Sequence, residues 1–384
     1  MRTNPANPVL GEKTLAWIDE EFPSLRSITH LDNSSVGVPP MSAMNAMERY
    51  FKGRIWGTTS FHEIVEMFED VRYLLSELLG GTPSNYALQT STTDAINAAA
   101  HSIPYPPGSN VVICDLEFPA NYIPWFNLKS FNDVDVRVVK SRDGMVSLDD
   151  FNEAIDNNTR VVSVSHVQFS NGFKIDAKAL AKLAHDHDAF VMLDIIQSAG
   201  VINFDLEALG VDFAAGQATK YLIGPIGAGY LYVRDAMFDR VKPRYMGWWG
   251  VQDMENFEFG ERIPYKDARM FQVGSSPIIC YQGLRESLKC LLSIPGEARE
   301  RASMLVANEI RELLEANGIS HGNLSPRCRS HVVSIVVPDV DAMHKQLLKQ
   351  RIYTSVRGGN IRASTHFYNS IGDAKTLVKS IEGF

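Results

Sequence analysis

Short apolar runs alternate with stretches of helical spacing through the middle of the chain. The runs predict strands at 86–89, 110–115, 160–166, 190–194, 212–215 and 228–233. Apolar positions at helical spacing lie between them, for example over 93–101 and over 176–185, where Asp176 can cap the helix. Strands separated by helices are typical of βαβ units. The pattern therefore predicts an α/β fold with a mostly parallel sheet covered on both faces.

The pattern changes after about residue 277. Long helices are predicted at 278–293 and 296–317, followed by strands at 331–337, 353–355 and 360–363 and by helices at 340–349 and 373–382. This order is typical of a smaller α+β unit. We therefore predict an N-terminal arm over 1–30 that packs on the small domain, a large domain over 31–277 and a small C-terminal domain over 278–384.

Composition narrows the classes of function. The 384 residues include 37 Lys and Arg against 45 Asp and Glu, which gives a formal net charge of -8 and argues against nucleic acid as a partner. The four cysteines form no Cys-x-x-Cys pair, so we expect neither a metal site nor a disulfide framework. The chain start lacks a signal-peptide core, and no apolar run approaches the ~20 residues that cross a bilayer. A cytoplasmic protein without a membrane partner is expected.

Polar residues follow several of the predicted strands, where open parallel sheets bind their ligands. The segment 89–94, Gln-Thr-Ser-Thr-Thr-Asp, precedes a helix and could hold a phosphate or simply cap that helix. Asp194 ends a fully apolar strand, where a carboxylate is costly unless it caps a turn or pairs with a group such as a cationic heterocycle N–H. Gln197, one turn further on, could bond a ring oxygen.

Two more groups lie later in the chain. Lys220 follows the next strand and is either a surface lysine or, beside a cationic cofactor, an amine nucleophile with a lowered pKa. Arg357 and Arg362 flank a glycine pair and could clamp a carboxylate or lie on a solvated edge. Taken in order, these parts describe an enzyme that uses pyridoxal 5′-phosphate on an amino acid.

Several motifs resemble those of the class V aminotransferase group of fold-type I pyridoxal-phosphate enzymes. Residues 194–200 are similar to the family's Asp-x-x-Gln-Ser-x-Gly, and 211–229 are similar to its lysine segment. Residues 31–37 resemble its N-terminal strand and turn, and 362–369 resemble its Arg-Ala-Ser…Tyr-Asn signature. The resemblance extends over nearly the whole chain. It implies the fold-type I architecture, with a large pyridoxal-phosphate-binding domain and a smaller α+β domain.

The resemblance also implies a role for each matching residue. Lys220 would form the Schiff base with pyridoxal 5′-phosphate, and Asp194 would keep the pyridine nitrogen protonated. Arg362, with Arg357 near it, would bind the substrate carboxylate. The family pattern further implies a homodimer with shared sites, in which Ser275 reaches the phosphate of the partner subunit. The other implied cofactor contacts are Thr92, Thr93, Phe118, Gln197, Gln217 and Thr219.

Three branches of the group predict different outcomes. Cysteine desulfurases carry a loop cysteine shortly before the carboxylate-binding arginine, and residues 348–362 contain none, which disfavours a desulfurase or C–S lyase. Kynureninases share Phe-Pro at 118–119 and Gly-Trp-Trp-Gly at 247–250, but this chain departs from them at Val251 and Thr219. Kynureninase-like hydrolysis of a β-substituted aromatic amino acid is therefore kept as an alternative.

The resemblance that remains is to isopenicillin N epimerase-like enzymes. It implies chemistry on an amino acid through an external aldimine and a Cα carbanion, with an epimerase, lyase or aminotransferase outcome. The outcome depends on a second acid/base group on the other face of the cofactor, for which Tyr122, His366 and Tyr368 are candidates. A pyridoxal-phosphate-binding protein without turnover is the non-enzyme alternative.

Overall fold

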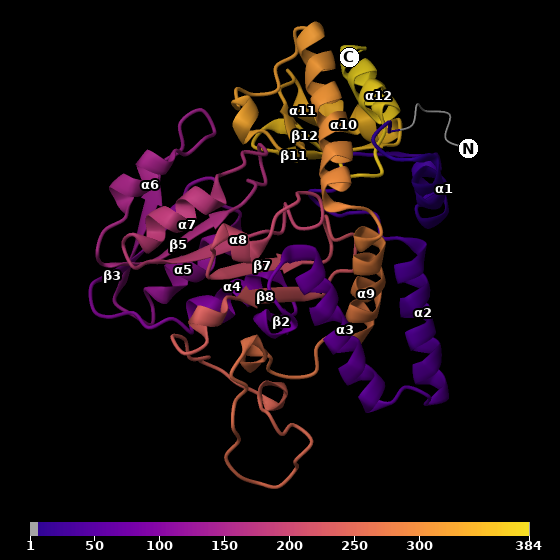
Figure 1. Cartoon of the computed structure of the whole chain (residues 1–384). Helices are drawn as coiled ribbons and strands as arrows, with labels where there is room; N and C mark the ends of the chain where they lie inside the picture. Colours follow the sequence, from indigo (N-terminus) through magenta and orange to yellow (C-terminus); the bar gives the residue numbers. More distant parts are fainter. Residues whose placement is uncertain (1–6, 384) are drawn as a thin grey trace.

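A mixed sheet forms the centre of the molecule (Figure 1). In residues 7–383, which the computed structural model describes, the sheet has seven strands in the order β2-β8-β7-β6-β5-β3-β4. Neighbouring strands are parallel except where β8 pairs with β2 and β7, which confirms the predicted mostly parallel sheet. The strands are β2 (Tyr86–Gln89), β3 (Ser109–Cys114), β4 (Val134–Val139), β5 (Thr159–Ser165), β6 (Phe190–Asp194), β7 (Phe213–Gln217) and β8 (Gly229–Val233).

Helices cover both faces of this sheet. Successive residues of a strand point to opposite faces, so Val112 and Leu193 lie in one apolar cluster while Val111 and Met192 lie in another. The first cluster packs under α3 (Phe61–Leu79), α7 (Ala177–His185) and α9 (Ile278–Leu292). The second packs under α4 (Thr92–Ala100) and α5 (Ile123–Leu128). This double cover explains why the central strands are apolar at consecutive positions.

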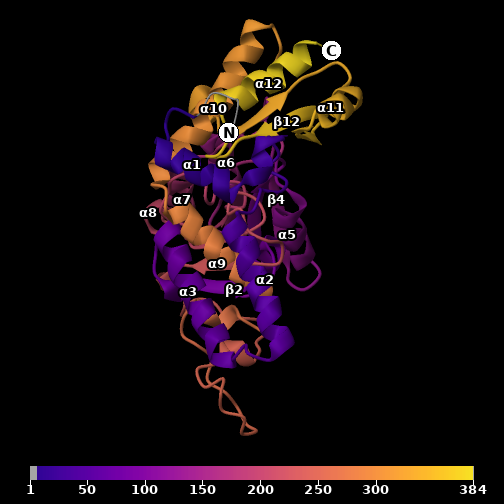
Figure 2. The same cartoon turned by 90° about the vertical axis from the view of Figure 1, so that its right-hand side faces the viewer.

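A second unit lies at one end of the molecule, as Figures 1 and 2 show. Within the described residues it contains an antiparallel sheet in the order β11-β12-β9, with an apolar cluster of its own. Its strands are β9 (Val332–Ile335), β11 (Ser355–Arg357) and β12 (Asn360–Ser364), and its helices are α10 (Gly296–Ala316), α11 (Val340–Lys349) and α12 (Ile371–Glu382). The α+β character predicted for this part of the chain is confirmed.

The N-terminal segment is joined to the C-terminal part of the chain. After α1 (Glu12–Glu21), β1 (Thr29–His30) pairs in parallel with β10 (Ile352–Tyr353). The ring of Phe22 packs against Phe367 and Tyr368, with centroid distances of 5.9 and 5.0 Å. Residues 1–6 of the predicted arm lie outside the described residues, and the division into an arm and two domains stays a prediction.

Some elements were not predicted from the pattern. β4 was missed because it alternates buried Val134 with exposed Asp135, as edge strands do, whereas the other strands are continuous apolar runs. The start of α3 carries a capping box between Ser60 and Glu63, a signal that can be read from sequence. The other helices without a prediction are α1, α2 (Met41–Trp56), α5, α6 (Leu148–Ala154) and α8 (Leu206–Leu209).

Two findings bear on membranes and metals. Among the described residues, no helix has both the length and the apolar composition needed to cross a membrane. Nor do residues 7–383 contain a group of three or more His, Cys, Asp or Glu side chains arranged to hold a metal ion.

Candidate active site

The predicted site residues meet at one edge of the large sheet. β6 ends at Asp194, and its neighbour β7 ends at Gln217, three residues before Lys220. β2 and β7 both run antiparallel to β8, so the end of β2 at Gln89 lies at the same edge. α4, which starts at Thr92, packs against β7 and β8. The topology thus gathers three segments that are far apart in the sequence.

Asp194 is a buried carboxylate at the end of its strand. Its Oδ1 atom accepts a hydrogen bond from the backbone N–H of Ile196 at 2.9 Å. Burial raises the pKa of Asp194, the nearby charge of Glu117 raises it further, and Lys220 opposes the shift. A buried carboxylate is costly unless it is paired with a cation, and a protonated heterocycle nitrogen would be such a partner for Asp194.

Lys220 lies next to the exposed face of Phe118. Its Nζ atom is 5.6 Å from the centroid of the Phe118 ring, and that ring packs edge-on against Phe169 at 5.1 Å. Burial lowers the pKa of Lys220, and Asp194 opposes this shift. The positive charges of Arg362 and Arg357 lower the pKa further. A lysine with a lowered pKa has a larger neutral fraction, so its amine can attack a carbonyl carbon or accept a proton.

Three buried polar atoms in these segments have no hydrogen-bond partner within the described chain. They are the hydroxyl oxygens of Thr92 and Thr219 and the Oε1 atom of Gln197. Buried polar atoms are almost always paired in folded proteins, so these atoms fit a polar ligand. The N-terminus of α4 adds unpaired N–H groups beside Thr92. The residues present therefore fit the phosphate and ring oxygen of pyridoxal 5′-phosphate.

The structure gives less information about the three remaining predicted cofactor residues. Thr93 is exposed in the first turn of α4, and Gln217 is half-buried at the end of β7. Ser275 lies between Phe271 and α9, and its side chain makes no hydrogen bond within residues 7–383. The contact expected of Ser275 is with a partner subunit, so its role stays a prediction.

The turn at 31–37 closes over the backbone of the lysine segment. Gln197 donates through Nε2 to the carbonyl oxygen of Ser34 at 3.1 Å, and the N–H of Gly37 donates to the carbonyl oxygen of Thr219 at 2.8 Å. A Cβ atom on Gly37 would lie 2.1 Å from the carbonyl oxygen of Lys220. The close approach of these two backbones therefore requires glycine at position 37.

We expect Gly37→Ala to push this turn away from Lys220. The colliding atom belongs to the backbone, so the substitution should cost about 1–3 kcal/mol of stability and weaken cofactor binding. Thermal unfolding and a fluorescence titration with pyridoxal 5′-phosphate measure the two effects. Gly11→Ala is the matched control because a Cβ atom on Gly11 meets nothing within 4 Å. Equal melting temperatures for both variants would contradict the argument.

Arg362 is buried and already bound by protein groups. Its Nε atom donates to the Ser355 hydroxyl at 3.1 Å, and its Nη1 atom donates to the Phe169 carbonyl oxygen at 2.7 Å. Its Nη2 atom donates to the Ser35 hydroxyl at 2.7 Å and forms an ion pair with Asp32 at 3.4 Å. A substrate carboxylate at Arg362 would have to replace some of these partners.

Arg357 is the more open of the two arginines. It is half-buried, and within the described chain its guanidinium donates only to the carbonyl oxygen of Val356, at 2.7 Å. It pairs with Asn360 across a tight turn in which Gly358 and Gly359 have φ values of 56° and 76°. This left-handed turn suits glycine and holds the two arginine-bearing strands together.

Two of the three candidates for a second acid/base group, His366 and Tyr368, are bonded to protein groups. The ring of His366 bonds the carbonyl oxygen of Tyr221 at 2.9 Å and the N–H of Phe367 at 2.8 Å. The hydroxyl of Tyr368 donates to Asn33 and accepts from the N–H of Val38. The ring of Tyr122 packs edge-on against Phe126. His366 and Tyr368 are thus engaged in holding the backbone and the turn at 31–37.

Sequence reasoning missed Glu117, which lies beside Phe118. Glu117 is buried, and its carboxylate accepts several hydrogen bonds. Its place directly before Phe118, one of the implied cofactor contacts, is the signal that could have identified it.

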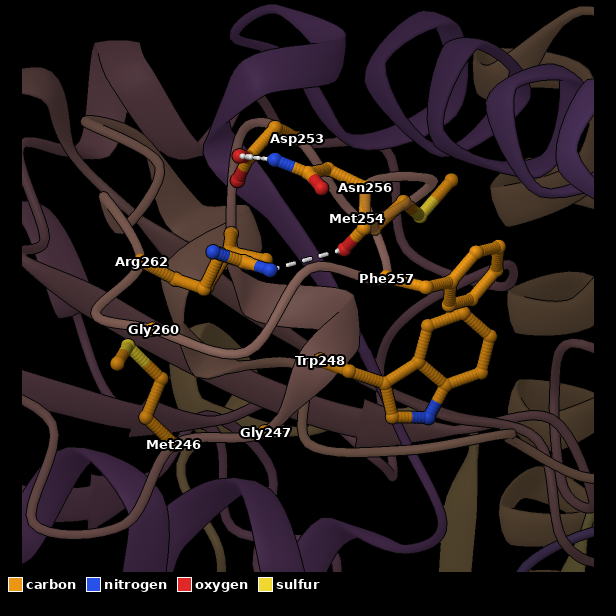
Figure 3. Close-up of a pocket in the computed structure, with 10 residues that line it drawn as sticks. Met246, Gly247, Trp248, Asp253, Met254, Asn256, Phe257, Gly260 and Arg262 are labelled. Atoms are coloured by element: carbon orange, nitrogen blue, oxygen red, sulfur yellow. Dashed lines mark hydrogen bonds between the residues drawn. The ribbon is translucent and has the colours of Figure 1, made fainter.

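A separate pocket lies in the loop that Figure 3 shows. The cavity has a volume of about 430 Å³, and Met246, Trp248, Phe257 and Arg262 are among the residues that line it. Arg262 donates to the carbonyl oxygen of Asn256 at 3.2 Å across this loop (Figure 3). None of the predicted site residues lines this pocket, so it is distinct from the site at the sheet edge.

The sequence pattern of the family described as Aminotransferase class-V matches residues 29–377. The chain is 27% identical to "Uncharacterized aminotransferase YcbU" of Bacillus subtilis over 364 residues, which cover 94% of this chain and 95% of that protein. It is also 27% identical to a "Probable cysteine desulfurase" of Methanothermobacter thermautotrophicus, over 95% of this chain and 96% of that protein.

Two solved structures have the same fold. The apo structure of a cysteine desulfurase from Thermococcus onnurineus NA1 gives a TM-score of 0.86 at 22% identity and covers 95% of this chain and 96% of its own. The complex between the cystine C-S lyase C-DES and its reaction product cysteine persulfide gives a TM-score of 0.87 at 21% identity and covers 94% and 99%. These likenesses confirm the predicted fold-type I architecture.

Proposed function

The chain belongs to the class V aminotransferase family and is a pyridoxal-phosphate-dependent enzyme, and from this premise we propose that it cleaves a carbon–sulfur bond in a sulfur-containing amino acid. The observation that carries the proposal is the similarity, over nearly the full length of both chains, to a protein named as a probable cysteine desulfurase. This proposal replaces the isopenicillin N epimerase-like reading that the motifs favoured. Among the outcomes open to the family, it selects the lyase reaction.

The side chains around the site favour a lyase over an epimerase. Phe118, which lies beside Lys220, packs on Phe169, and neither ring can carry a proton. Epimerisation needs a second group that returns a proton from the other face, and two of the three candidates, His366 and Tyr368, already form hydrogen bonds with protein groups. Elimination of a sulfur substituent needs only one base, which Lys220 can supply.

We propose that the sulfur leaves without help from a protein thiol. Cys114 and Cys290 are buried, Cys280 and Cys328 are half-buried, and burial raises the pKa of the Cys114, Cys280 and Cys290 thiols. The segment before Arg362, where a loop cysteine is expected of a desulfurase, is here the tight turn at 358–359 between two paired strands. A thiol-independent C–S lyase accounts for both features.

The roles proposed for the residues follow from their positions. Bound pyridoxal 5′-phosphate supplies an electron sink for negative charge that develops at Cα. The Lys220 amine takes the Cα proton, the electron pair of that bond forms a Cα=Cβ double bond, and the Cβ–S electron pair leaves with the sulfur. Asp194 holds the proton on the pyridine nitrogen, and Phe118 excludes water from one face.

Incubation of the cofactor-loaded protein with L-cystine and L-cysteine tests this proposal. We expect pyruvate together with sulfide or persulfide, because the double bond formed at Cα hydrolyses to a keto acid and ammonia. Parallel reactions with kynurenine, with an L-amino acid plus a keto acid, and with single enantiomers test the hydrolase, aminotransferase and epimerase alternatives. Turnover in one of those reactions, without pyruvate from either sulfur substrate, would replace the proposal.

Substitution of Arg357 and of Arg362 should have different effects on the melting temperature. We expect Arg357→Ala to raise KM about 10-fold or more at an unchanged melting temperature, because its open guanidinium has few protein partners to lose. Arg362→Ala should raise KM and also lower the melting temperature, because Asp32 and Ser35 lose a buried partner. Lys349→Ala, on the exposed end of α11, is the control for both measurements. Equal melting temperatures for the two arginine variants would argue against this division.

We also propose that the protein is a homodimer. Large side chains are exposed on α2, where Phe51 is 58%, Ile55 77% and Trp56 80% accessible. The loop at 252–263 exposes Phe257 and Phe259, which are 89% and 107% accessible. Exposed apolar groups of this size are typical of an interface. Light scattering should give about twice 42.8 kDa for the wild type and a lower mass for Trp56→Glu combined with Phe259→Glu.

A further inference from the structure

Glu117 is a buried acid that forms no ion pair within the described chain. It lies between the end of β3 and the short helix at Pro119–Asn121, and it is 5% exposed. Its Oε1 atom accepts from the N–H of Ser165 at 2.8 Å, from Nε2 of Gln168 at 2.6 Å and from the thiol of Cys114 at 3.3 Å. Its Oε2 atom accepts from Nδ2 of Asn121 at 2.8 Å and from the hydroxyl of Ser165 at 2.5 Å. Neutral donors from several segments thus converge on one carboxylate.

These donors connect Glu117 to both sides of the candidate site. Ser165 ends β5 and pairs in register with Asp194 at the end of β6. Gln168 directly precedes Phe169, whose ring packs on Phe118 and whose carbonyl oxygen accepts from Arg362. Phe118 directly follows Glu117 in the chain. The buried carboxylate of Glu117 therefore fixes the segments that carry the Phe118 and Phe169 rings. It also fixes the carbonyl oxygen that accepts from Arg362.

We propose that Glu117 is a positioning residue that fixes the Phe118 ring against the bound cofactor and, through Gln168, fixes the Phe169 carbonyl oxygen on Arg362. This inference deepens the proposed function and rests on the proposed roles of Phe118 and Arg362. Glu117 itself touches neither Lys220 nor Arg362 through a hydrogen bond. We expect Glu117 to act through the Phe118 ring and the Phe169 carbonyl oxygen, in addition to the effect of its charge on Asp194.

The amide in Glu117→Gln would have the same shape but the wrong hydrogen-bonding pattern. Its oxygen can keep the donors at the Oε1 position, but its NH₂ group then faces the NH₂ group of Asn121. Asn121 cannot turn its amide without cost, because its Oδ1 atom accepts from the Ser163 hydroxyl at 2.7 Å and from the Trp125 indole at 3.4 Å. The variant therefore loosens the anchor of the 117–121 segment without creating a cavity.

Cofactor binding to the purified protein provides the test. For Glu117→Gln we expect the dissociation constant of pyridoxal 5′-phosphate to rise about 10-fold, the size of one lost hydrogen bond to a charged group. The visible circular-dichroism band per bound cofactor should also weaken, because it reports how the ring is held against Phe118. Borohydride labelling of Lys220 should persist, which separates a failure of this inference from a failure of the cofactor site itself.

Asp212→Asn is the matched control. Asp212 is a fully buried carboxylate at the other end of the strands of the same sheet. It bonds His185 and the N–H of Val191 at 2.8 Å and, unlike Glu117, also forms an ion pair with Arg234. This control should lower the melting temperature but keep the wild-type cofactor affinity and circular dichroism. If Glu117→Gln behaves like the control, Glu117 is only structural and the inference is wrong.

A second variant keeps the test decisive if Glu117→Gln fails to fold. Gln168→Leu removes the bond that connects Glu117 to the segment of Phe169 and leaves the other donors in place. It should weaken the same circular-dichroism band at nearly the wild-type melting temperature. A band of wild-type strength in folded Gln168→Leu would overturn the inference.

Discussion

Lys220→Ala is expected to abolish covalent attachment of the cofactor and to reduce turnover by about 1,000-fold or more. Lys220 combines the two properties that this chemistry requires. Its amine is held beside Phe118, and burial lowers its pKa so that the neutral form is accessible near neutral pH. No other lysine or histidine bonds or faces the Phe118 ring in the part of the chain that the structure describes. The loss should therefore not be compensated by a neighbouring base.

Reduction with borohydride followed by peptide mass spectrometry measures the attachment, and product formation measures turnover. Wild type should carry the pyridoxyl group on the peptide that contains Lys220, and Lys220→Ala should carry none. Lys182→Ala, an exposed lysine on α7, is the matched control and should behave like the wild type in both assays. Turnover of Lys220→Ala at the wild-type rate would show that another residue is the base.

Asp194→Asn is expected to keep the bound cofactor but to lower turnover by about 100-fold or more. The amide has the size of the carboxylate, so the bond from the N–H of Ile196 to the side-chain oxygen can persist. The negative charge, however, is lost. A pyridine nitrogen without an anionic partner gives up its proton more readily, and an unprotonated ring withdraws electrons from Cα less strongly.

The absorption spectrum of the bound cofactor and the turnover number measure these two effects separately. Asp176→Asn is the control, because Asp176 caps α7 and asparagine is an equally good cap. If Asp194→Asn turned over substrate as fast as Asp176→Asn, Asp194 would be no more than a turn-forming residue. Loss of cofactor affinity in Asp194→Asn at intact turnover would also contradict the assigned role.

The central strands, and the end of the sheet at which the site is expected, could be predicted from short stretches of sequence. The strand 190–194 matches β6 residue for residue, since a continuous apolar run leaves few alternatives. Asp194 ends such a strand and Lys220 comes three residues after the end of the next one, so the rule that ligands bind beyond strand ends predicts both at the same edge.

Contacts between distant segments could not be predicted in the same way. The ion pair between Asp32 and Arg362 joins residues from the two ends of the chain, and the sequence around either residue does not predict it. Glu117 was not predicted, because its importance lies in donors from Ser165 and Gln168 that only the fold brings near.

The parallel pairing of β1 with β10 has a consequence for how the enzyme is made. The two strands are separated by about 320 residues, which a ribosome needs roughly 20–60 s to add. Until β10 has emerged, β1 of the nascent chain has no partner strand, so the pairing of the two ends of the chain is absent. We therefore expect the complete cofactor site to form only after synthesis is almost finished. A messenger truncated before codon 352 would yield a chain with Lys220 and Asp194 but without the closing strand pair.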